Sequence, residues 1–276
     1  MAEFVIRKVR TMEEIRGIVE IQRKAWDSVD LEIVPTFEMK AVTDVGIVLA
    51  AFDRSNKPIG FIYGYHHFPD VHYSHMMAVL PEWQGKGIGY ELKKTHRKLA
   101  LESAHPVNYI KWTVDPLLPN NAFLNFAKLG AYSAKYYVNY YGDPSGFGLY
   151  EGLPTDRFLI TWPIRSQRVE RRMRDYGKDR IPKQELLERS PPINGIHGER
   201  WRKIRDFHEL DSFSAQVPSS FREMRAKDEI AMEWRIKFRE LCLKAFAHGW
   251  RAIDYHSFRV GGKRENYYEF SKIASE

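Results

Sequence analysis

A glycine-rich stretch at residues 84–89 has the residue types and spacing best suited to chemistry. It reads Gln-Gly-Lys-Gly-Ile-Gly and lies between an apolar run at 76–80 and a helical pattern at 90–104. Glycine accepts a positive φ and lets a ligand approach the backbone closely. N–H groups at the start of a helix attract anions. With the added charge of Lys86, the stretch is predicted to hold a phosphate group.

Two common nucleotide-binding loops do not fit this stretch. A dinucleotide loop needs a third glycine at position 90, which is Tyr90, and the Gly-Lys-Ser/Thr of a P-loop is missing. An ordinary glycine-rich turn from strand to helix stays open as an interpretation. The pattern Gln-x-x-Gly-x-Gly, with Val-Leu-Pro before it at 79–81, resembles the acyl-CoA pyrophosphate loop of the GNAT (N-acetyltransferase) superfamily.

A second motif follows a strand-like run at 107–114. Asn120 or Asn121 is expected to cap a helix through Lys128, and a glycine ends it. Asn-Ala, followed by Lys-Leu-Gly-Ala at 128–131, resembles the helix after the fifth GNAT strand. The two motifs together imply a mixed α+β GNAT fold: a central splayed mixed sheet flanked by helices, plus a C-terminal α+β extension.

Further residues resemble a subgroup of predicted GNAT acyltransferases. Some of its members are associated with N-succinylamino-acid racemases and transfer succinyl groups to amino acids. The matching residues are the runs 112–117, 121–125, 139–142 and 155–158, and Trp162. This narrower match covers residues 4–175 and implies acetyl-CoA or succinyl-CoA as co-substrate, with no metal.

The resemblance assigns roles to particular residues of this chain. The backbone of three residues before the loop would bind the pantetheine arm as a false strand, and a backbone N–H near Met77 would support the developing oxyanion. Asn121 would touch the arm from the other side. The arm contacts are expected at Met77, Ala78 and Val79, and the pyrophosphate contacts at Gln84, Gly85, Lys86, Gly87, Ile88 and Gly89.

The proton chemistry departs from the family pattern. Many members carry a tyrosine two residues before Lys-x-Gly, and that position is Phe126, which cannot donate a proton. Either another tyrosine serves, or no acid is essential because a thiolate with a pKa of about 8.5 is a tolerable leaving group. The candidate acids are Tyr136, Tyr137, Tyr140 and Tyr141, and the candidate bases are Glu32, Glu82 and His75.

Four residues are candidate contacts of the acceptor substrate. Trp26 stands at the start of an aperiodic loop, and Asp115 and Asn125 follow the fifth strand. Asp115 and Asn125 also have an explanation as turn and capping residues. Arg157 precedes an expected strand at 158–162 and is expected to bind a carboxylate of the acceptor or acyl group.

Composition limits the partners and the compartment. The net charge of +7 and pI of about 9.3 favour an anionic partner such as CoA or a nucleic acid, but Asp and Glu are interleaved with the basic residues of 165–205. A solvated face is therefore favoured over a nucleic-acid track. Cys242, as the single cysteine, excludes an internal disulfide and a cysteine zinc site. No apolar stretch reaches the roughly 18 residues of a membrane span, so a cytoplasmic protein is expected.

A metal site was weighed for four histidines and not favoured. His66, His67, His72 and His75 lie close in sequence, but no acidic or cysteine ligands stand near them at helical spacing.

The element order should begin with a strand at 4–10 and a helix started by a capping box of Thr11 and Glu14. A helix and three strands should follow, at 36–43, 45–52, 59–65 and 71–80. We expect a GNAT domain over 1–165, a basic helix and linker over 166–192, and a C-terminal α+β subdomain over 193–276 that packs on the first. In that last part, strands are expected at 198–206, 213–217, 251–258 and 267–270, around a helix that Gly249 ends.

The function predicted from these features is a CoA-dependent N-acyltransferase. It would move an acetyl or succinyl group from acyl-CoA to the amine of a small molecule or amino acid, by direct attack on the thioester. Two other classes stay open: a non-catalytic acyl-CoA-binding module, which Phe126 favours, and a basic nucleic-acid- or ribosome-associated protein. A homodimer is a further option.

Overall fold

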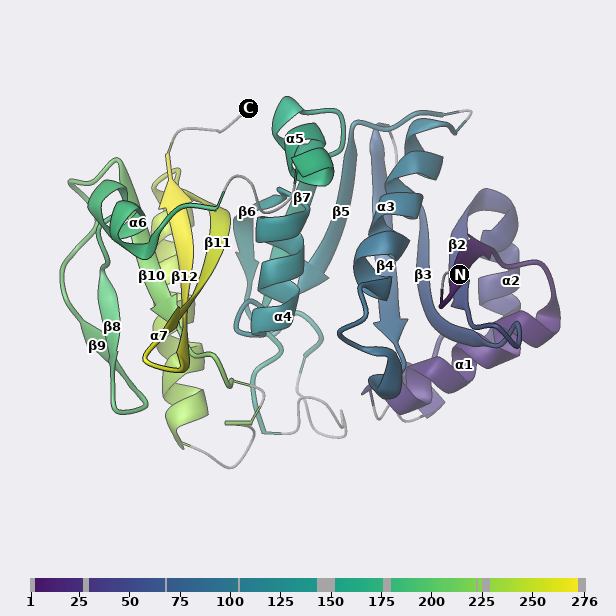
Figure 1. The fold of residues 1–276 in the computed structure, drawn as a ribbon, viewed down its shortest axis with the longest axis horizontal. Helices are drawn as coiled ribbons and strands as arrows, with labels where there is room; N and C mark the ends of the chain where they lie inside the picture. Colours follow the sequence, from purple (N-terminus) through teal and green to yellow (C-terminus); the bar gives the residue numbers. More distant parts are fainter. Residues whose placement is uncertain are drawn as a thin grey trace. The chain divides into compact units, whose positions relative to one another are not determined.

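The computed structural model describes residues 3–26, 30–67, 69–103, 105–142, 152–175, 180–221, 223–224 and 229–272 (Figure 1). These residues form two compact units, and the chain passes from the first to the second between Trp112 and Thr113. Each unit is described by itself. The domain boundaries expected at 165 and 192 stay a prediction.

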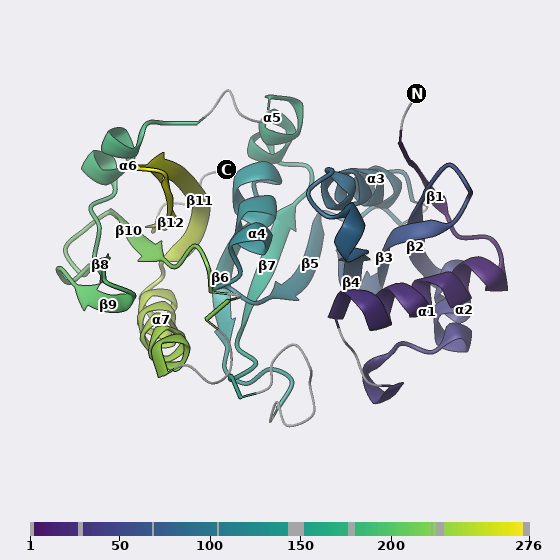
Figure 2. The same ribbon diagram turned by 60° about the horizontal axis from the view of Figure 1, so that its bottom comes forward.

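The first unit is a twisted sheet covered by helices on both faces (Figure 2). Its strands follow the order β1-β2-β3-β4-β5, antiparallel up to β4 and parallel between β4 and β5. Helices α1 and α2 cover one face and α3 covers the other. The elements are β1 (Val5–Lys8), α1 (Met12–Trp26), η1 (Asp30–Glu32), α2 (Thr36–Val45), β2 (Gly46–Phe52), β3 (Pro58–His67), β4 (Val71–Val79), η2 (Pro81–Trp83), α3 (Ile88–Leu101) and β5 (Tyr109–Val114).

The predicted capping box starts α1 as expected. The Glu14 backbone N–H donates to the Thr11 hydroxyl at 3.2 Å, and the Thr11 N–H donates to the Glu14 carboxylate at 3.4 Å. This exchange satisfies two N–H groups that the first helical turn leaves without partners. The buried side of α1 is formed by Ile15, Ile18 and Ile21, which pack onto the sheet.

The second unit is built on an antiparallel sheet of order β7-β6-β11-β12-β10, beside a two-stranded hairpin of β8 and β9. Three tryptophans, Trp162, Trp234 and Trp250, lie fully buried in its core. The elements are α4 (Pro119–Ala122), η3 (Phe123–Lys128), β6 (Tyr132–Tyr137), β7 (Arg157–Pro163), α5 (Gln167–Asp175), α6 (Lys183–Arg189), β8 (Asn194–His197), β9 (Arg200–Lys203), β10 (Ser212–Val217), α7 (Glu229–Ala247), β11 (Arg251–Val260) and β12 (Lys263–Ser271).

Three expectations for the second unit need correction. The helix expected from Asn120 or Asn121 begins at Pro119 with Leu118 at the N-cap, and no side chain caps it. It then widens into a π-helical turn, η3. The strand expected at 198–206 is shorter: it is β9, which follows a turn at Gly198 and pairs with β8 to form a hairpin. The stretch taken as helix and linker contains a second helix, α6.

The C-terminal strands join the sheet of β6 and β7. Ala252 of β11 pairs with Ser133 of β6, and β12 and β10 extend the sheet from there. Gly249, with φ of 82°, follows α7 at the predicted helix end. In the described part of the chain, no helix is long and apolar enough to cross a membrane.

Candidate active site

The glycine loop lies between η2 and α3, as its sequence predicts. Gly85 and Gly87 have φ of 79° and 82°, and a Cβ built on either would meet no atom within 4 Å. The N–H groups of Gly85, Lys86 and Gly87 donate no hydrogen bond to any described residue. Three free donors therefore precede the N-terminus of α3, where its dipole is positive, and they can receive an anion.

Two side chains fix the ends of this loop. The Gln84 side-chain amide donates to the backbone oxygen of Val79 at 3.1 Å, which ties the loop to the end of β4. The Lys86 ammonium pairs with Glu3 at 2.8 Å and lies 4.2 Å from the centre of the Trp83 ring. Because Lys86 is exposed and its partner is an exposed carboxylate, it can exchange that partner for a phosphate.

The strand before the loop diverges from its neighbour. β4 pairs with β5 only at Val71, His72 and Tyr73, whereas it pairs with β3 as far as Val79. The register with β3 shifts between Tyr63 and Tyr65, where β4 has one extra residue, a β-bulge. Among the described residues, β4 beyond Tyr73 has no partner on its β5 side. This leaves Met77, Ala78 and Val79 beside an open strand edge.

His75 lies at this bulge and among aromatic rings. The ring centres of Tyr63, Tyr65 and Tyr73 lie 5.7, 6.1 and 6.3 Å from that of His75. The Tyr63 hydroxyl donates to the Glu38 carboxylate at 3.2 Å. Desolvation by the surrounding rings lowers the pKa of His75, and the attraction of Glu38 only partly opposes this. His75 is therefore neutral, and able to accept a proton, at neutral pH.

Beneath α3, on the opposite face of β4, lies a buried polar cluster. His72 and His96 are fully buried with ring centres 4.7 Å apart, and in the described part of the chain none of their ring nitrogens has a hydrogen-bond partner. The Lys93 ammonium donates to the Ser74 hydroxyl at 3.1 Å and lies 3.4 Å from the centre of the Trp112 ring. Burial lowers the pKa of Lys93 well below its usual value. His72 was one of the four histidines considered for a metal site and His96 was not, and the sequence showed no sign that either is buried.

The other predicted residues of the first unit have packing roles. Trp26, at the end of α1, packs edge-to-face on Phe61 with ring centres 6.0 Å apart. Glu32 is half-buried in η1. Their expected contacts with substrate stay predictions.

The predicted substrate residues of the second unit are buried. Asp115 accepts two hydrogen bonds from Arg235 at 2.9 and 2.6 Å, and its Oδ1 also accepts from the Leu117 N–H at 2.9 Å. Burial would raise the pKa of Asp115, but Arg235 outweighs it and lowers the pKa. Asn125 is 3% exposed in η3.

Arg157 is also enclosed. It is 3% exposed, donates to the Asp156 backbone oxygen at 2.8 Å and stacks on Tyr141. Asn121, the predicted contact of the pantetheine arm, is exposed on α4. Its role stays a prediction.

The tyrosine candidates for a general acid differ in environment. Tyr136 is buried, and burial and then the nearby Asp156, which accepts its hydroxyl at 2.8 Å, raise its pKa, so it is a poor proton donor. Tyr140 and Tyr141 are exposed. Phe126 packs against Phe158 and Tyr268 as a core residue.

Sequence reasoning missed two arginines of α7. Arg235 binds Asp115, and Arg239 binds both oxygens of Asp156 at 2.8 and 2.9 Å. Two arginines four residues apart share one face of a helix. The buried residues of this helix include Trp234 and Phe238. The spacing of the two arginines beside them was the signal in the sequence that could have indicated buried ion pairs.

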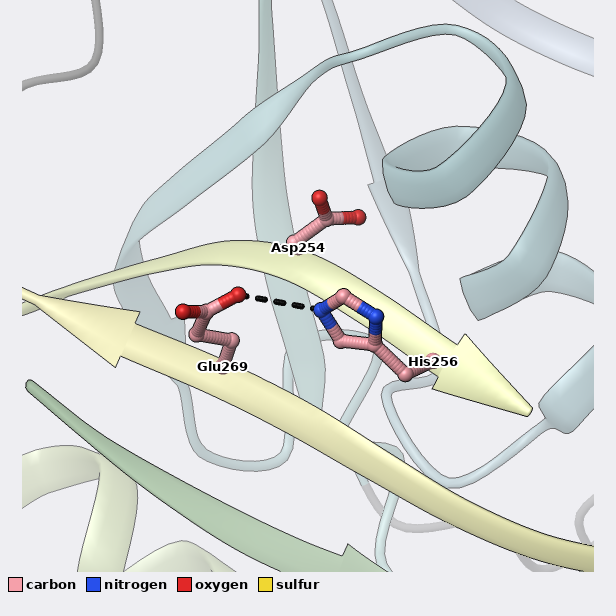
Figure 3. Close-up of side chains that lie close together, drawn as sticks. All are labelled: Asp254, His256 and Glu269. Carbon is pink, nitrogen blue, oxygen red and sulfur yellow. Dashed lines mark hydrogen bonds and ion pairs between the residues drawn. The ribbon is translucent and has the colours of Figure 1, made fainter. Parts of the chain in front are cut away.

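A group of possible metal ligands lies on β11 and β12 and consists of Asp254, His256 and Glu269 (Figure 3). Its carboxylate oxygens already accept hydrogen bonds: Glu269 from Arg189, Ser190 and His256, and Asp254 from Arg172 and the Tyr255 N–H. Burial would raise the pKa of Glu269, but these donors lower it to about 2. A cation would have to displace two arginines, so the group is better explained as an ion-pair network.

The first unit thus combines two features. The N–H groups of its glycine loop, at the N-terminus of α3, donate to no described residue, and its strand β4 separates from β5 after Tyr73. The predicted α+β fold class, a mixed sheet flanked by helices, is confirmed.

The family comparison agrees with that class. Residues 15–131 match the model of the Acetyltransferase (GNAT) family, a segment that is less than half of the chain. Over that segment, the match agrees with the predicted acyltransferase of the GNAT N-acetyltransferase type. No curated protein sequence matches the chain.

Several solved structures are similar at low identity. The ribosomal-protein-S18-alanine N-acetyltransferase from Escherichia coli is 18% identical with a TM-score of 0.45, over 58% of this chain and 94% of that one. A GNAT superfamily phosphinothricin acetyltransferase from Sinorhizobium meliloti, in complex with AcCoA, is 18% identical with a TM-score of 0.47, over 59% and 89%. A GNAT family acetyltransferase from Elizabethkingia anophelis, with acetyl-CoA bound, is 19% identical with a TM-score of 0.46, over 59% and 99%.

Proposed function

We propose that the protein transfers an acetyl or succinyl group from acyl-CoA to the amine of a small molecule or an amino acid. The observation that carries the proposal is the continuity of β4 with the glycine loop. In the described part of the chain, the edge of β4 at 77–79 has no β5 partner, and it leads directly into three N–H groups ahead of α3 that donate to no described residue. An extended arm with a diphosphate at its end has the chemistry that this edge and loop can bind.

In this proposal the loop binds the diphosphate through the N–H groups of Gly85, Lys86 and Gly87. The arm lies along β4, and a backbone N–H near Met77 stabilises the oxyanion that forms when the amine attacks the thioester carbonyl. His75 accepts the proton of the amine, since its lowered pKa keeps it neutral. The C–N bond forms, the C–S bond breaks, and the thiolate leaves without an essential acid.

The experiment compares two glycine substitutions of equal backbone strain. Gly87→Glu places a carboxylate in the loop, whereas Gly198→Glu places one at another left-handed, unobstructed turn. Each residue would adopt a conformation that costs about 1–2 kcal/mol. We expect Gly87→Glu to weaken acetyl-CoA binding about 100-fold, or about 2.7 kcal/mol, and Gly198→Glu to leave the affinity unchanged. Titration calorimetry and thiol release measure binding and turnover.

Retained affinity in Gly87→Glu, with the fold intact by circular dichroism, would remove the loop from the site. Tight CoA binding without thiol release over a broad screen of amines and amino acids would favour the non-catalytic module. Salt-sensitive RNA binding without CoA affinity would favour the nucleic-acid-associated class.

A further inference from the structure

The surface around His75 combines features that bear on the acceptor. The aromatic patch consists of Tyr63, Tyr65, Tyr73, His75 and Glu38. Tyr63 and Tyr65 come from β3, Tyr73 and His75 from β4, and Glu38 from α2. The tyrosine rings also contact one another, with centres 6.2 Å apart for Tyr63 and Tyr65 and 5.9 Å apart for Tyr65 and Tyr73.

The patch has a buried base and a solvent-exposed rim. Tyr63 is 1% exposed and its hydroxyl holds the carboxylate of Glu38, whereas Glu38 and His75 are exposed and Tyr65 and Tyr73 are half-buried. A molecule at the surface can therefore contact the exposed parts of Tyr65 and Tyr73, the Glu38 carboxylate and the imidazole.

This combination of groups recognises a cation. The faces of aromatic rings carry negative potential and attract ammonium groups by about 0.5–2 kcal/mol. A carboxylate adds attraction for a positive group and repels a negative one. His75 adds no opposing charge at neutral pH, because partial desolvation by the neighbouring rings lowers its pKa, although part of the side chain is exposed. An amine acceptor reaches the enzyme as an ammonium ion and fits this description.

The residue expected to bind an acceptor carboxylate is enclosed instead. Arg157 is 3% exposed and directs NH1 to a backbone oxygen. The described groups around His75 thus favour the ammonium of an acceptor and disfavour a carboxylate beside it.

Building on the proposed function, we propose that the aromatic patch selects primary amines that carry no carboxylate on the carbon next to the nitrogen. Glu38 and the rings of Tyr65 and Tyr73 hold the ammonium group. One N–H proton passes to the lone pair of a ring nitrogen of His75. The neutral amine then forms the C–N bond with the acyl carbon, and the C–S bond breaks. The imidazolium then returns the proton to the CoA thiolate or to water.

Matched pairs of substrates test directly which class of amine the protein accepts. Phenethylamine and phenylalanine differ by one carboxylate next to their single amine, as do tyramine and tyrosine. With saturating acetyl-CoA, we expect kcat/KM at least about 10-fold higher for the amine of each pair. An equal or higher value for the amino acids would overturn the proposal.

Two variants of α2 test the role of Glu38. Glu38→Gln removes the charge and keeps an oxygen that can accept from Tyr63, and we expect it to raise KM for the amine about 10-fold with kcat and acetyl-CoA affinity little changed. Asp44→Asn removes an exposed carboxylate from the same helix, 74% exposed at its side chain, and should change nothing. An unchanged KM in Glu38→Gln, or an equal effect of both variants, would contradict the proposal.

A binding measurement separates this inference from the proposed function. Calorimetry of the same four probes with the CoA-saturated protein requires no turnover. Tighter binding of phenethylamine and tyramine, lost in Glu38→Gln, supports the patch even if the acyl transfer fails. Equal binding of both members of each pair overturns the patch even if acyl transfer occurs.

Discussion

The buried histidines beneath α3 predict a marked loss of stability in mild acid. His72 and His96 are fully buried, and their neighbours include His66 at 5.2 Å between ring centres and Lys93. Burial, then repulsion from His66 and Lys93, lowers the pKa of His72 to about 3, and burial lowers that of His96 well below its ordinary value. His72 is therefore neutral in the folded protein between pH 5 and 8, and burial favours the neutral form of His96 as well.

The sign of the effect follows from proton uptake. An unfolded histidine has a pKa of about 6.5, so below that pH the unfolded chain binds protons that the folded protein does not bind. The contribution of these neutral histidines to the free energy of unfolding is thus fully present above about pH 6.5 and is lost as the pH falls below that value. For His72 the free energy of unfolding decreases by about 2 kcal/mol between pH 7 and pH 5. His96 adds to this loss in the same direction, out of a total stability of about 5–15 kcal/mol.

Urea unfolding at several pH values between 5 and 7.5 measures this dependence. His72→Leu should remove about 2 kcal/mol of the difference between pH 7 and pH 5, and the double variant with His96→Leu should remove more. His67→Leu, which changes an exposed histidine of β3, should keep the full difference. The buried carboxylates with lowered pKa, such as Glu269, change the free energy of unfolding mainly below pH 5 and contribute little to the difference between pH 7 and pH 5. An unchanged pH dependence in the double variant would refute the reasoning.

Two further predictions concern buried charges. Arg235→Met leaves Asp115 buried without its bidentate partner and should lower the free energy of unfolding by about 3–5 kcal/mol, whereas the double variant Arg235→Met/Asp115→Leu should recover most of it in urea unfolding; a double variant as unstable as the single one would contradict this. Lys93→Met removes an amine whose pKa burial lowers, so wild type should gain stability relative to the variant as the pH rises from 7 to 10. A difference that does not change with pH would show that Lys93 stays charged in the fold.

Local sequence rules predicted the parts of the structure that depend on neighbours in the chain. The Thr11–Glu14 capping box forms both of its hydrogen bonds, and Gly87 adopts the left-handed conformation that was predicted for the glycine loop. These outcomes depend on a few consecutive residues, whose backbone preferences act alike in most contexts.

Contacts between distant residues could not be predicted in this way. Asp115 and Arg235 are 120 residues apart in the chain, and as a turn residue Asp115 already had a complete local explanation. The bulge in β4 likewise depends on register with β3, which no pattern within β4 specifies. Strand β6 was missed because its tyrosines read as candidate acids, while its pairing with β7 and β11 decides its structure.

Helix α3 links the two parts of the proposed chemistry in the first unit. Its N-terminus begins at the glycine loop, and Lys93, about 7.5 Å further along the axis, donates to Ser74 beside His75 at the bulge. A displacement of α3 would therefore move the anion-binding donors and the bulge together. Apolar residues in place of His72 and His96 would avoid the burial of unpartnered polar groups, each of which costs about 1–3 kcal/mol. Polar residues that lower stability at such a position are expected where function constrains the fold, and here they lie directly behind the strand that would hold the acyl group.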